Sequence, residues 1–361
     1  MPPPAKRRSE LVTLIDFGLG AGACCFGFEG GSRHSGTIRA RRTDRGRVAV
    51  ALEAWLGGAD IAPGTRRELH GIRRSAGDDP AALLDAWAAR CGRSEGARVG
   101  APYQVGWCSW YYYFHGVTEA AFTDNLAHAA DWPFTVIQLD DGYQRAIGDW
   151  LLTNEKFPSG VEGVAGQTSA RGLTPGLWLA PFVAAPSSRV AAAHPEWFAR
   201  ELERDEPLMG MYHPDWGGVM WELDTTREDV LDHLASTSRS LVEMGYQYLK
   251  LDFTFSAAVP GRFSDPTRTP AERVRAGYDA VRAGAGNDAF ILGCGCPLGA
   301  VIGSVDAMRI GPDVAPWWGV TAASGALPGY DAAAPSTRNA WVSTLGRSFM
   351  HRRLWLNDPD C

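Results

Sequence analysis

The chain has 361 residues, of which 45% are hydrophobic and 11% aromatic, so it has enough apolar side chains for a large buried core. Its 35 basic and 41 acidic residues give a net charge of −6 without long charged blocks, which argues against nucleic-acid and membrane-surface partners. No stretch reaches the roughly 20 apolar residues that cross a bilayer, and no signal-peptide-like segment follows the basic residues near the N-terminus. Seven scattered cysteines form no disulfide framework. We therefore expect a cytoplasmic globular protein.

Residues 1–100 have the pattern of a partial N-terminal β-sandwich-like region followed by a connecting helix. Three short β-type runs are separated by glycine-rich turns: residues 11–17, 37–41 and 47–56. Residues 79–91 then carry Leu83 and Trp87 at helical spacing, with Pro80 in a first-turn position. The pattern predicts an incomplete β domain joined by a helix to the remainder of the chain.

One segment of this region, Gly18–Ala23, matches the loose dinucleotide-binding pattern G-x-G-x-x-A after a β-type run. That site needs a helix that begins at the glycines. Residues 23–36 instead contain four further glycines and no helical periodicity. We therefore expect no nicotinamide or flavin cofactor.

From residue 101 to residue 361, short β-type runs alternate with helical segments. The seven β-type runs are residues 104–110, 134–140, 176–182, 246–253, 289–295, 307–310 and 353–356. The helical segments are residues 119–130, 227–244, 270–283 and 338–349. Thr226 and Asp229 resemble a capping box at the start of the second segment. The alternation predicts a parallel sheet in an α/β fold, and the number of strands favours a catalytic (β/α)8 TIM-type barrel.

The number of predicted strands is one short of a closed barrel. The chain ends directly after the seventh run, so we expect a fragment of a longer protein, with a barrel that is truncated before its eighth strand. The alternative is that residues 219–223 form a genuine barrel strand. We favour a hairpin at this point, because residues 209–215 are rich in turn-forming types.

Reactive groups of parallel barrels come from the carboxyl ends of the strands. The predicted strand ends carry acids, cations, aromatic rings and a thiol: Asp140, Asp141, Asp252, Asp313, Lys250, Arg309, Trp110, Tyr111, Trp178 and Cys294. Two such acids are what sugar transfer through a covalent intermediate requires, although either acid alone could equally be a helix cap or a turn residue. The eight histidines form no H-x-H or H-E-x-x-H motif, so we expect no metal-assisted hydrolase.

These motifs resemble glycoside hydrolase family 36, the α-galactosidase (melibiase) family, which also contains raffinose and stachyose synthases. The resemblance covers roughly residues 100–361 and rests on six ordered motifs: Gly106–Trp110, Leu139–Tyr143, Gly176–Pro181, Lys250–Asp252, Cys294–Pro297 and Arg309–Asp313. It implies that Asp252 is the catalytic nucleophile and Asp313 the catalytic acid/base. It also implies a set of substrate-binding residues: Asp140, Asp141, Lys250, Arg309, Cys294, Trp178, Trp110 and Tyr111.

Simple electrostatics supports this division of roles. Lys250 projects to the same side of its strand as Asp252, so we expect its charge to keep the nucleophile ionised. The acid must hold a proton, and we expect Pro312, Pro316, Trp317 and Trp318 to supply an apolar setting for Asp313. We expect Arg309 to face the substrate instead of Asp313.

The sequence departs from the family pattern at Thr254, where members often carry asparagine, and in residues 209–221, where an expected arginine is absent. A further family motif, Asn357–Asp360, is interpreted as structural. We predict a retaining hydrolase of α-galactoside oligosaccharides that uses no cofactor and no metal. The alternatives are a galactosyl transferase of the raffinose-synthase type and a non-catalytic sugar-binding fragment. The sequence is compatible with a monomer and with an oligomer.

Overall fold

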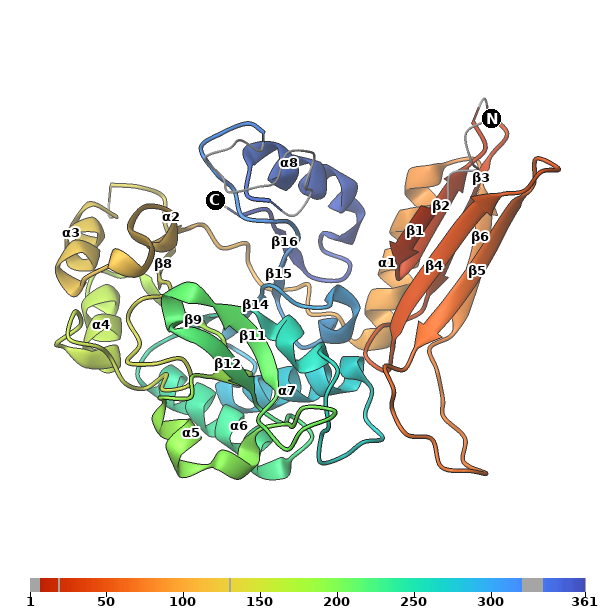
Figure 1. Ribbon diagram of the computed structural model, residues 1–361. Coiled ribbons are helices and arrows are strands. Elements are labelled where there is room, and N and C mark those ends of the chain that lie inside the picture. Colours follow the sequence, from red (N-terminus) through yellow and green to blue (C-terminus); the bar gives the residue numbers. More distant parts are fainter. Residues whose placement is uncertain (1–6, 19, 130, 320–333, 361) are drawn as a thin grey trace.

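The computed structural model describes residues 7–18, 20–129, 131–319 and 334–360, which form six N-terminal strands beside a larger α/β part (Figure 1). The N-terminal strands form two antiparallel sheets. One contains β1 (Arg7–Glu10), β4 (Ser35–Arg42) and β5 (Val48–Trp55). The other contains β2 (Val12–Asp16), β3 (Ala23–Phe28) and β6 (Ile72–Gly77). The three predicted runs are confirmed as β2, β4 and β5, and β3 occupies the place where a dinucleotide-binding helix would have to begin.

The connecting helix α1 (Pro80–Glu95) begins where the sequence predicts and extends beyond the predicted end at residue 91. The Asp79 side chain accepts hydrogen bonds from two backbone N–H groups of the first turn, and Gly96 ends the helix with a φ of 70°. The indole of Trp87 donates to the backbone oxygen of Phe28 on β3 at 2.9 Å. The helix therefore packs against the β3 sheet and lies beside the α/β part (Figure 1).

The centre of the larger part is a curled, fully parallel sheet of seven strands, so the fold is α/β. Its strands are β7 (Gly106–Cys108), β8 (Val136–Leu139), β9 (Thr174–Leu179), β13 (Tyr248–Leu251), β14 (Phe290–Gly293), β15 (Ala307–Arg309) and β16 (Leu356–Asp358). Their spatial order is β16-β15-β14-β13-β9-β8-β7. Every predicted run overlaps a strand, although β9 begins two residues before its run and β16 begins where its run ends. Within the described chain, β7 and β16 are not paired with each other.

Helices lie around this sheet (Figure 1). They are α2 (Trp110–Tyr113), α3 (Glu119–Ala129), α4 (Gly160–Ser169), α5 (Arg189–Ala193), α6 (Glu228–Glu243), α7 (Pro270–Ala285) and α8 (Thr337–Gly346). Helices α3, α6, α7 and α8 are the four predicted ones. None of the described helices combines the length and the apolar composition that a membrane crossing needs.

The capping box predicted at Thr226 and Asp229 is wrong. Arg227 is the N-cap of α6, and the Thr226 hydroxyl donates to Asp224 instead. A complete capping box opens α7, where the Thr269 hydroxyl accepts from the backbone of Glu272 and the Glu272 carboxylate accepts from the backbone of Thr269.

The run at residues 219–223 is a hairpin strand, as favoured, and not a strand of the parallel sheet. β12 (Gly218–Glu222) pairs antiparallel with β11 (Met209–His213) and with β10 (Val183–Ala184). A 3₁₀ turn at Pro214–Trp216 connects β11 to β12, and Gly217 leaves this turn with a φ of 89°. The turn lies against residues that follow the parallel strands, because the Trp216 and Phe253 rings are 5.3 Å apart.

Candidate active site

Asp140 follows β8 and accepts several hydrogen bonds in a buried position. Its Oδ2 accepts from Lys250 Nζ at 2.9 Å, from Gln138 Nε2 at 2.5 Å and from Cys108 Sγ at 3.4 Å, and its Oδ1 accepts from the backbone N–H of Asp141 at 2.9 Å. Asp140 is 2% exposed and Lys250 is 5% exposed. The two side chains therefore form a buried ion pair, and neutral donors provide the other hydrogen bonds of the Asp140 carboxylate.

The expectation that Lys250 serves Asp252 directly is corrected by this ion pair. Lys250 does project inward from β13, but its ammonium bonds to the carboxylate on β8. Burial is the largest influence on the pKa of Lys250 and lowers it, yet the charge of Asp140, together with smaller contributions from Cys108, Cys294 and Asp252, raises that pKa well above its ordinary value. Lys250 is therefore a fixed positive charge within the curled sheet.

Asp252 directly follows β13, and neutral donors hold its carboxylate. Trp178 Nε1 on β9 donates to Oδ2 at 3.2 Å, and the backbone N–H of Phe253 donates to Oδ1 at 2.7 Å. Phe253 has a φ of 53°, a strained conformation for a residue with a side chain. This strained turn directs the Phe253 amide back to the carboxylate of the preceding residue.

The loop after β14 closes over Asp252. A Cβ atom at Gly295 would lie 2.8 Å from Asp252 Oδ1, so only glycine permits this approach. Cys294 is 6% exposed, and its pKa is raised well above the ordinary value by burial and then by the charge of Asp252. Cys294 is therefore a neutral thiol beside the carboxylate. Thr254 points away from this group, since its hydroxyl lies 3.0 Å from the buried Tyr278 hydroxyl.

Asp141 is 3% exposed and is held by three side chains. His115 Nε2 lies 2.8 Å from Oδ2, Trp216 Nε1 donates to Oδ2 at 2.7 Å, and Gln144 Nε2 donates to Oδ1 at 2.6 Å. The pKa of His115 is raised above its ordinary value, chiefly by the hydrogen bond to Asp141. None of these three partners was predicted from the sequence.

Arg309 on β15 contacts two carboxylates. Its Nη2 lies 2.7 Å from Asp313 Oδ1 and also bonds to Asp360, which follows β16. The expectation that Arg309 avoids Asp313 is therefore wrong. So is the apolar setting expected for Asp313, because its side chain is 45% exposed and ion-paired, and Trp318 is 61% exposed.

Asp360 was interpreted as structural, yet it lies within this cluster. Its carboxylate accepts hydrogen bonds from the Tyr111 hydroxyl, from Arg309 and, at 2.7 Å, from the backbone N–H of Val314. Val314 follows Asp313, so Asp360 anchors the loop that carries the predicted acid/base. The repeated acids of the Asn357–Asp360 motif were the available sequence signal for this role.

The remaining predicted residue, Trp110, packs edge-on against the His115 ring at 4.9 Å and so adjoins Asp141. A cavity of about 240 Å³ opens between the edge strands β7 and β16. Its lining includes Cys108, Tyr111, Gln138, Lys250, Arg309 and Asp360. The structure thus places Lys250, Tyr111 and Arg309 around one hollow, and Asp140 adjoins it through its ion pair with Lys250. Asp252, Trp178 and Cys294 lie near the carboxyl ends of the neighbouring strands β13, β9 and β14.

Comparisons with known proteins find relatives of this chain. The melibiase family model matches residues 107–271. The α-galactosidase AgaA of Geobacillus stearothermophilus is 30% identical over 152 residues, which are 40% of this chain and 20% of that protein. A type A blood α-D-galactosamine galactosaminidase of Flavonifractor plautii is 26% identical over 212 residues, 54% of this chain and 19% of that protein. The aligned segment thus spans about a fifth of the length of these curated relatives.

Solved structures match nearly the entire chain. TtGalA, an α-galactosidase from Thermus thermophilus in complex with stachyose, is 30% identical with a TM-score of 0.78, over 98% of this chain and 69% of that one. AgaA, at 17% identity and a TM-score of 0.65, shares the fold over 97% of this chain and 49% of that one. The chain belongs to glycoside hydrolase family 36, the family of the α-galactosidases.

Proposed function

We propose that the protein hydrolyses terminal α-linked galactose with retention of configuration, with Asp252 as the nucleophile and Asp313 as the acid/base. The observation that carries the proposal is the placement of Asp252. Two neutral N–H donors hold its carboxylate at the end of β13, and Lys250 is already neutralised by Asp140. A carboxylate that neutral donors orient has no ion pair to break before it attacks.

In the first step, an Asp252 oxygen forms a bond to the anomeric carbon while the bond from that carbon to the glycosidic oxygen breaks. Asp313 gives its proton to the departing oxygen. In the second step, Asp313 takes a proton from water, the water oxygen bonds to the anomeric carbon, and the bond to Asp252 breaks. Two inversions at one carbon give net retention.

The surroundings of Asp313 suit an acid that must exchange protons with water. Its side chain is 45% exposed, and its partner Arg309 is shared with the buried Asp360. Because Asp360 already balances the guanidinium, Asp313 can leave Arg309 when it accepts a proton. Arg309 then becomes available to the sugar.

We further propose that the other predicted residues bind the sugar. Asp140 and Asp141 would accept from galactose hydroxyls, Lys250 and Arg309 would donate to them, and Trp178, Cys294, Trp110 and Tyr111 would form the walls. Solved relatives hold stachyose and p-nitrophenyl α-D-galactopyranoside, which supports α-galactosides as substrates. Bound sugar would displace some of the side chains that now donate hydrogen bonds to the Asp141 carboxylate.

We also propose that residues 1–100 form a partial β domain and residues 101–361 a catalytic barrel that lacks its eighth strand. The support is that the edge strands β7 and β16 are unpaired with each other in the described chain and that both line one cavity. An eighth strand between them would cover that cavity and satisfy both edges.

The test replaces Asp252 with alanine and measures turnover of p-nitrophenyl α-D-galactopyranoside. The variant should lose nearly all activity, and external azide should restore part of it by attacking from the vacated side. Asp205→Ala, at a side chain that is 88% exposed, is the matched control and should keep wild-type rates. Wild-type turnover by Asp252→Ala would refute the assignment. Repeating the assay with sucrose present separates hydrolysis, which releases free galactose, from transfer.

A further inference from the structure

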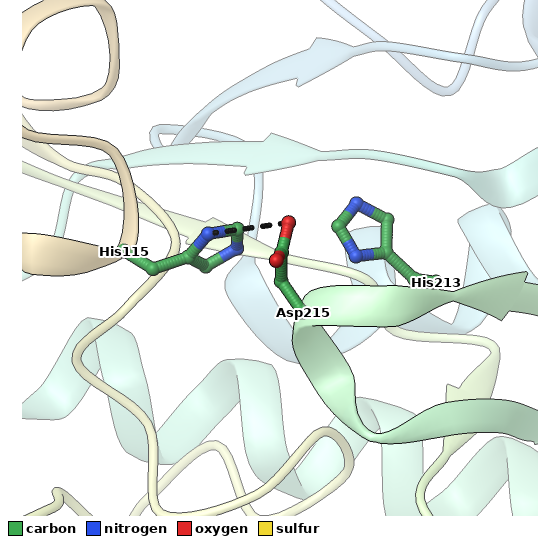
Figure 2. A group of neighbouring side chains, drawn as sticks. All are labelled: His115, His213 and Asp215. Carbon is green, nitrogen blue, oxygen red and sulfur yellow. Dashed lines mark ion pairs between the residues drawn. The ribbon is translucent and has the colours of Figure 1, made fainter.

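Two histidines and an aspartate converge beside Asp141. His115 follows α2, whereas His213 ends β11 and Asp215 lies in the turn after it. Figure 2 shows the Asp215 carboxylate between the two imidazole rings. One nitrogen from each ring and one carboxylate oxygen lie within 4.8 Å of one another. His115 lies far from His213 and Asp215 in the sequence, so no metal-binding motif indicates the cluster.

The hydrogen bonds of His115 fix which nitrogen faces this cluster. Nε2 is engaged with Asp141 Oδ2 at 2.8 Å, while Nδ1 faces Asp215 Oδ2 at 3.8 Å. Imidazoles that bind metals usually donate their second nitrogen to a carboxylate, which orients the ring and makes the free nitrogen a better ligand. Asp141 gives His115 this arrangement.

His213 carries the second indication of a ligand. Its Nδ1 is shielded from solvent, and it has no hydrogen-bond partner among the residues that the structure describes. A buried polar atom without a partner is costly and needs an explanation. The ring is also held in place, since it stacks on Trp216 with centroids 4.4 Å apart and planes 20° from parallel.

We propose that His115, His213 and Asp215 bind a Zn²⁺ ion, with water as the fourth ligand. Two imidazole nitrogens and one carboxylate oxygen form a donor set that Zn²⁺ accepts in sites with an open position. Ligand atoms around tetrahedral zinc are about 3.3 Å apart, so the cluster must contract on binding. The Asp215 side chain is 61% exposed and can turn toward the rings.

The ion would connect the β11–β12 turn to the segment after α2. Because His115 also bonds to Asp141, the ion would hold the His115 ring in one orientation against this proposed sugar-binding carboxylate. The role is therefore structural or regulatory, and the hydrolysis described above needs no metal. Zinc binding stands independently of the proposed galactosidase activity.

The test is direct titration of the purified, chelator-treated chain with Zn²⁺ against a fluorescent chelator. The wild type should bind one equivalent saturably. Asp215→Asn and His213→Ala should each weaken binding by at least about tenfold, since loss of a ligand costs no less than loss of an orienting partner. His194→Ala is the matched control, because His194 also lies 3.3 Å from a carboxylate, that of Glu196, and it should bind as the wild type does.

Two further measurements test whether other side chains bind the metal and whether metal binding is separate from turnover. A Co²⁺-loaded sample should show ligand-field absorption without a thiolate-to-metal charge-transfer band, which excludes the cysteines as ligands. Asp252→Ala should retain full zinc affinity, so that loss of turnover and loss of metal binding stay separate. Absence of saturable binding in the wild type, or equal affinity in wild type and Asp215→Asn with circular dichroism unchanged, would overturn the site.

Discussion

The indole nitrogen of Trp178 lies 3.2 Å from Asp252 Oδ2, so a buried residue of β9 holds the carboxylate that follows β13. The two strands are hydrogen-bonded neighbours, and Lys250 is paired in register with Trp178. The position of the predicted nucleophile therefore depends on the pairing of these strands as well as on its own loop.

Replacing Trp178 with phenylalanine tests this support. The variant keeps a buried ring but loses the N–H donor to a charged oxygen, and we expect kcat/KM toward a nitrophenyl α-galactoside to fall by about tenfold to a hundredfold. Trp150→Phe is the control, because Trp150 is also buried and its ring meets Trp178 edge-on at 5.8 Å. An equal loss of activity in both variants would assign the effect to packing and not to the hydrogen bond.

Gly295 tests how closely the loop after β14 must approach Asp252. In Gly295→Ala the new methyl group would meet Asp252 Oδ1 at 2.8 Å, so we expect at least a tenfold loss of kcat/KM. The substitution also places a side chain at a φ of 51°, which should lower the free energy of unfolding by about 1 kcal/mol. Gly172→Ala carries the same kind of strain at a φ of 74° with no atom within 4 Å, and it should lose stability but not activity. Full activity in Gly295→Ala would show that the loop can move away.

The parallel strands could be predicted well from the sequence because both faces of the sheet are buried. β8 and β14 are buried at every position, so their apolar runs are continuous and easily recognised. Helix α4 was missed because Gly160, Gly163 and Gly166 dilute its helical pattern. The predicted strand-end acids follow from the same logic, since the carboxyl ends of parallel strands share one edge of a sheet.

The partners of those acids could not be predicted in the same way. Period-two alternation places Lys250 and Asp252 on one side of β13, but it does not say that Lys250 reaches across to Asp140. His115 and Trp216 come from loops, whose course leaves no periodic trace in the sequence. Asp360 reaches Arg309 because β16 lies next to β15, an adjacency that the sheet order supplies.

Asp360 should be important for stability. Arg309 is 3% exposed and Asp360 5% exposed at their side chains, so Asp360→Asn leaves the buried guanidinium with the half-exposed Asp313 as its remaining ion-pair partner among the described residues. We expect the free energy of unfolding in urea to fall by about 3 kcal/mol. The control Asp205→Asn breaks an ion pair with Arg262 whose side chains are 88% and 51% exposed, and it should change stability by less than about 0.5 kcal/mol. Similar values for the two variants would contradict the role of Asp360.

The N-terminal part contains a histidine that should make stability depend on pH. The backbone N–H of Arg33 donates to His70 Nε2 at 2.9 Å, so that nitrogen must carry a lone pair in the folded state. Burial, followed by the charges of His34 and Arg33, lowers the pKa of His70 to about 4. The unfolded chain binds this proton near pH 6.5, so it holds more protons than the folded chain between these two values.

The stabilising contribution of neutral His70 is therefore complete above about pH 6.5 and is lost as the pH falls toward about 4. We expect urea midpoints to fall across this window, with His70 accounting for a loss on the order of 2 kcal/mol after allowance for partial solvent screening. His70→Gln offers an acceptor that does not titrate, and it should flatten this part of the curve. His194→Gln, at a side chain that is 42% exposed, should leave the slope unchanged. If His70→Gln loses stability with acid as steeply as the wild type does, other groups cause the dependence.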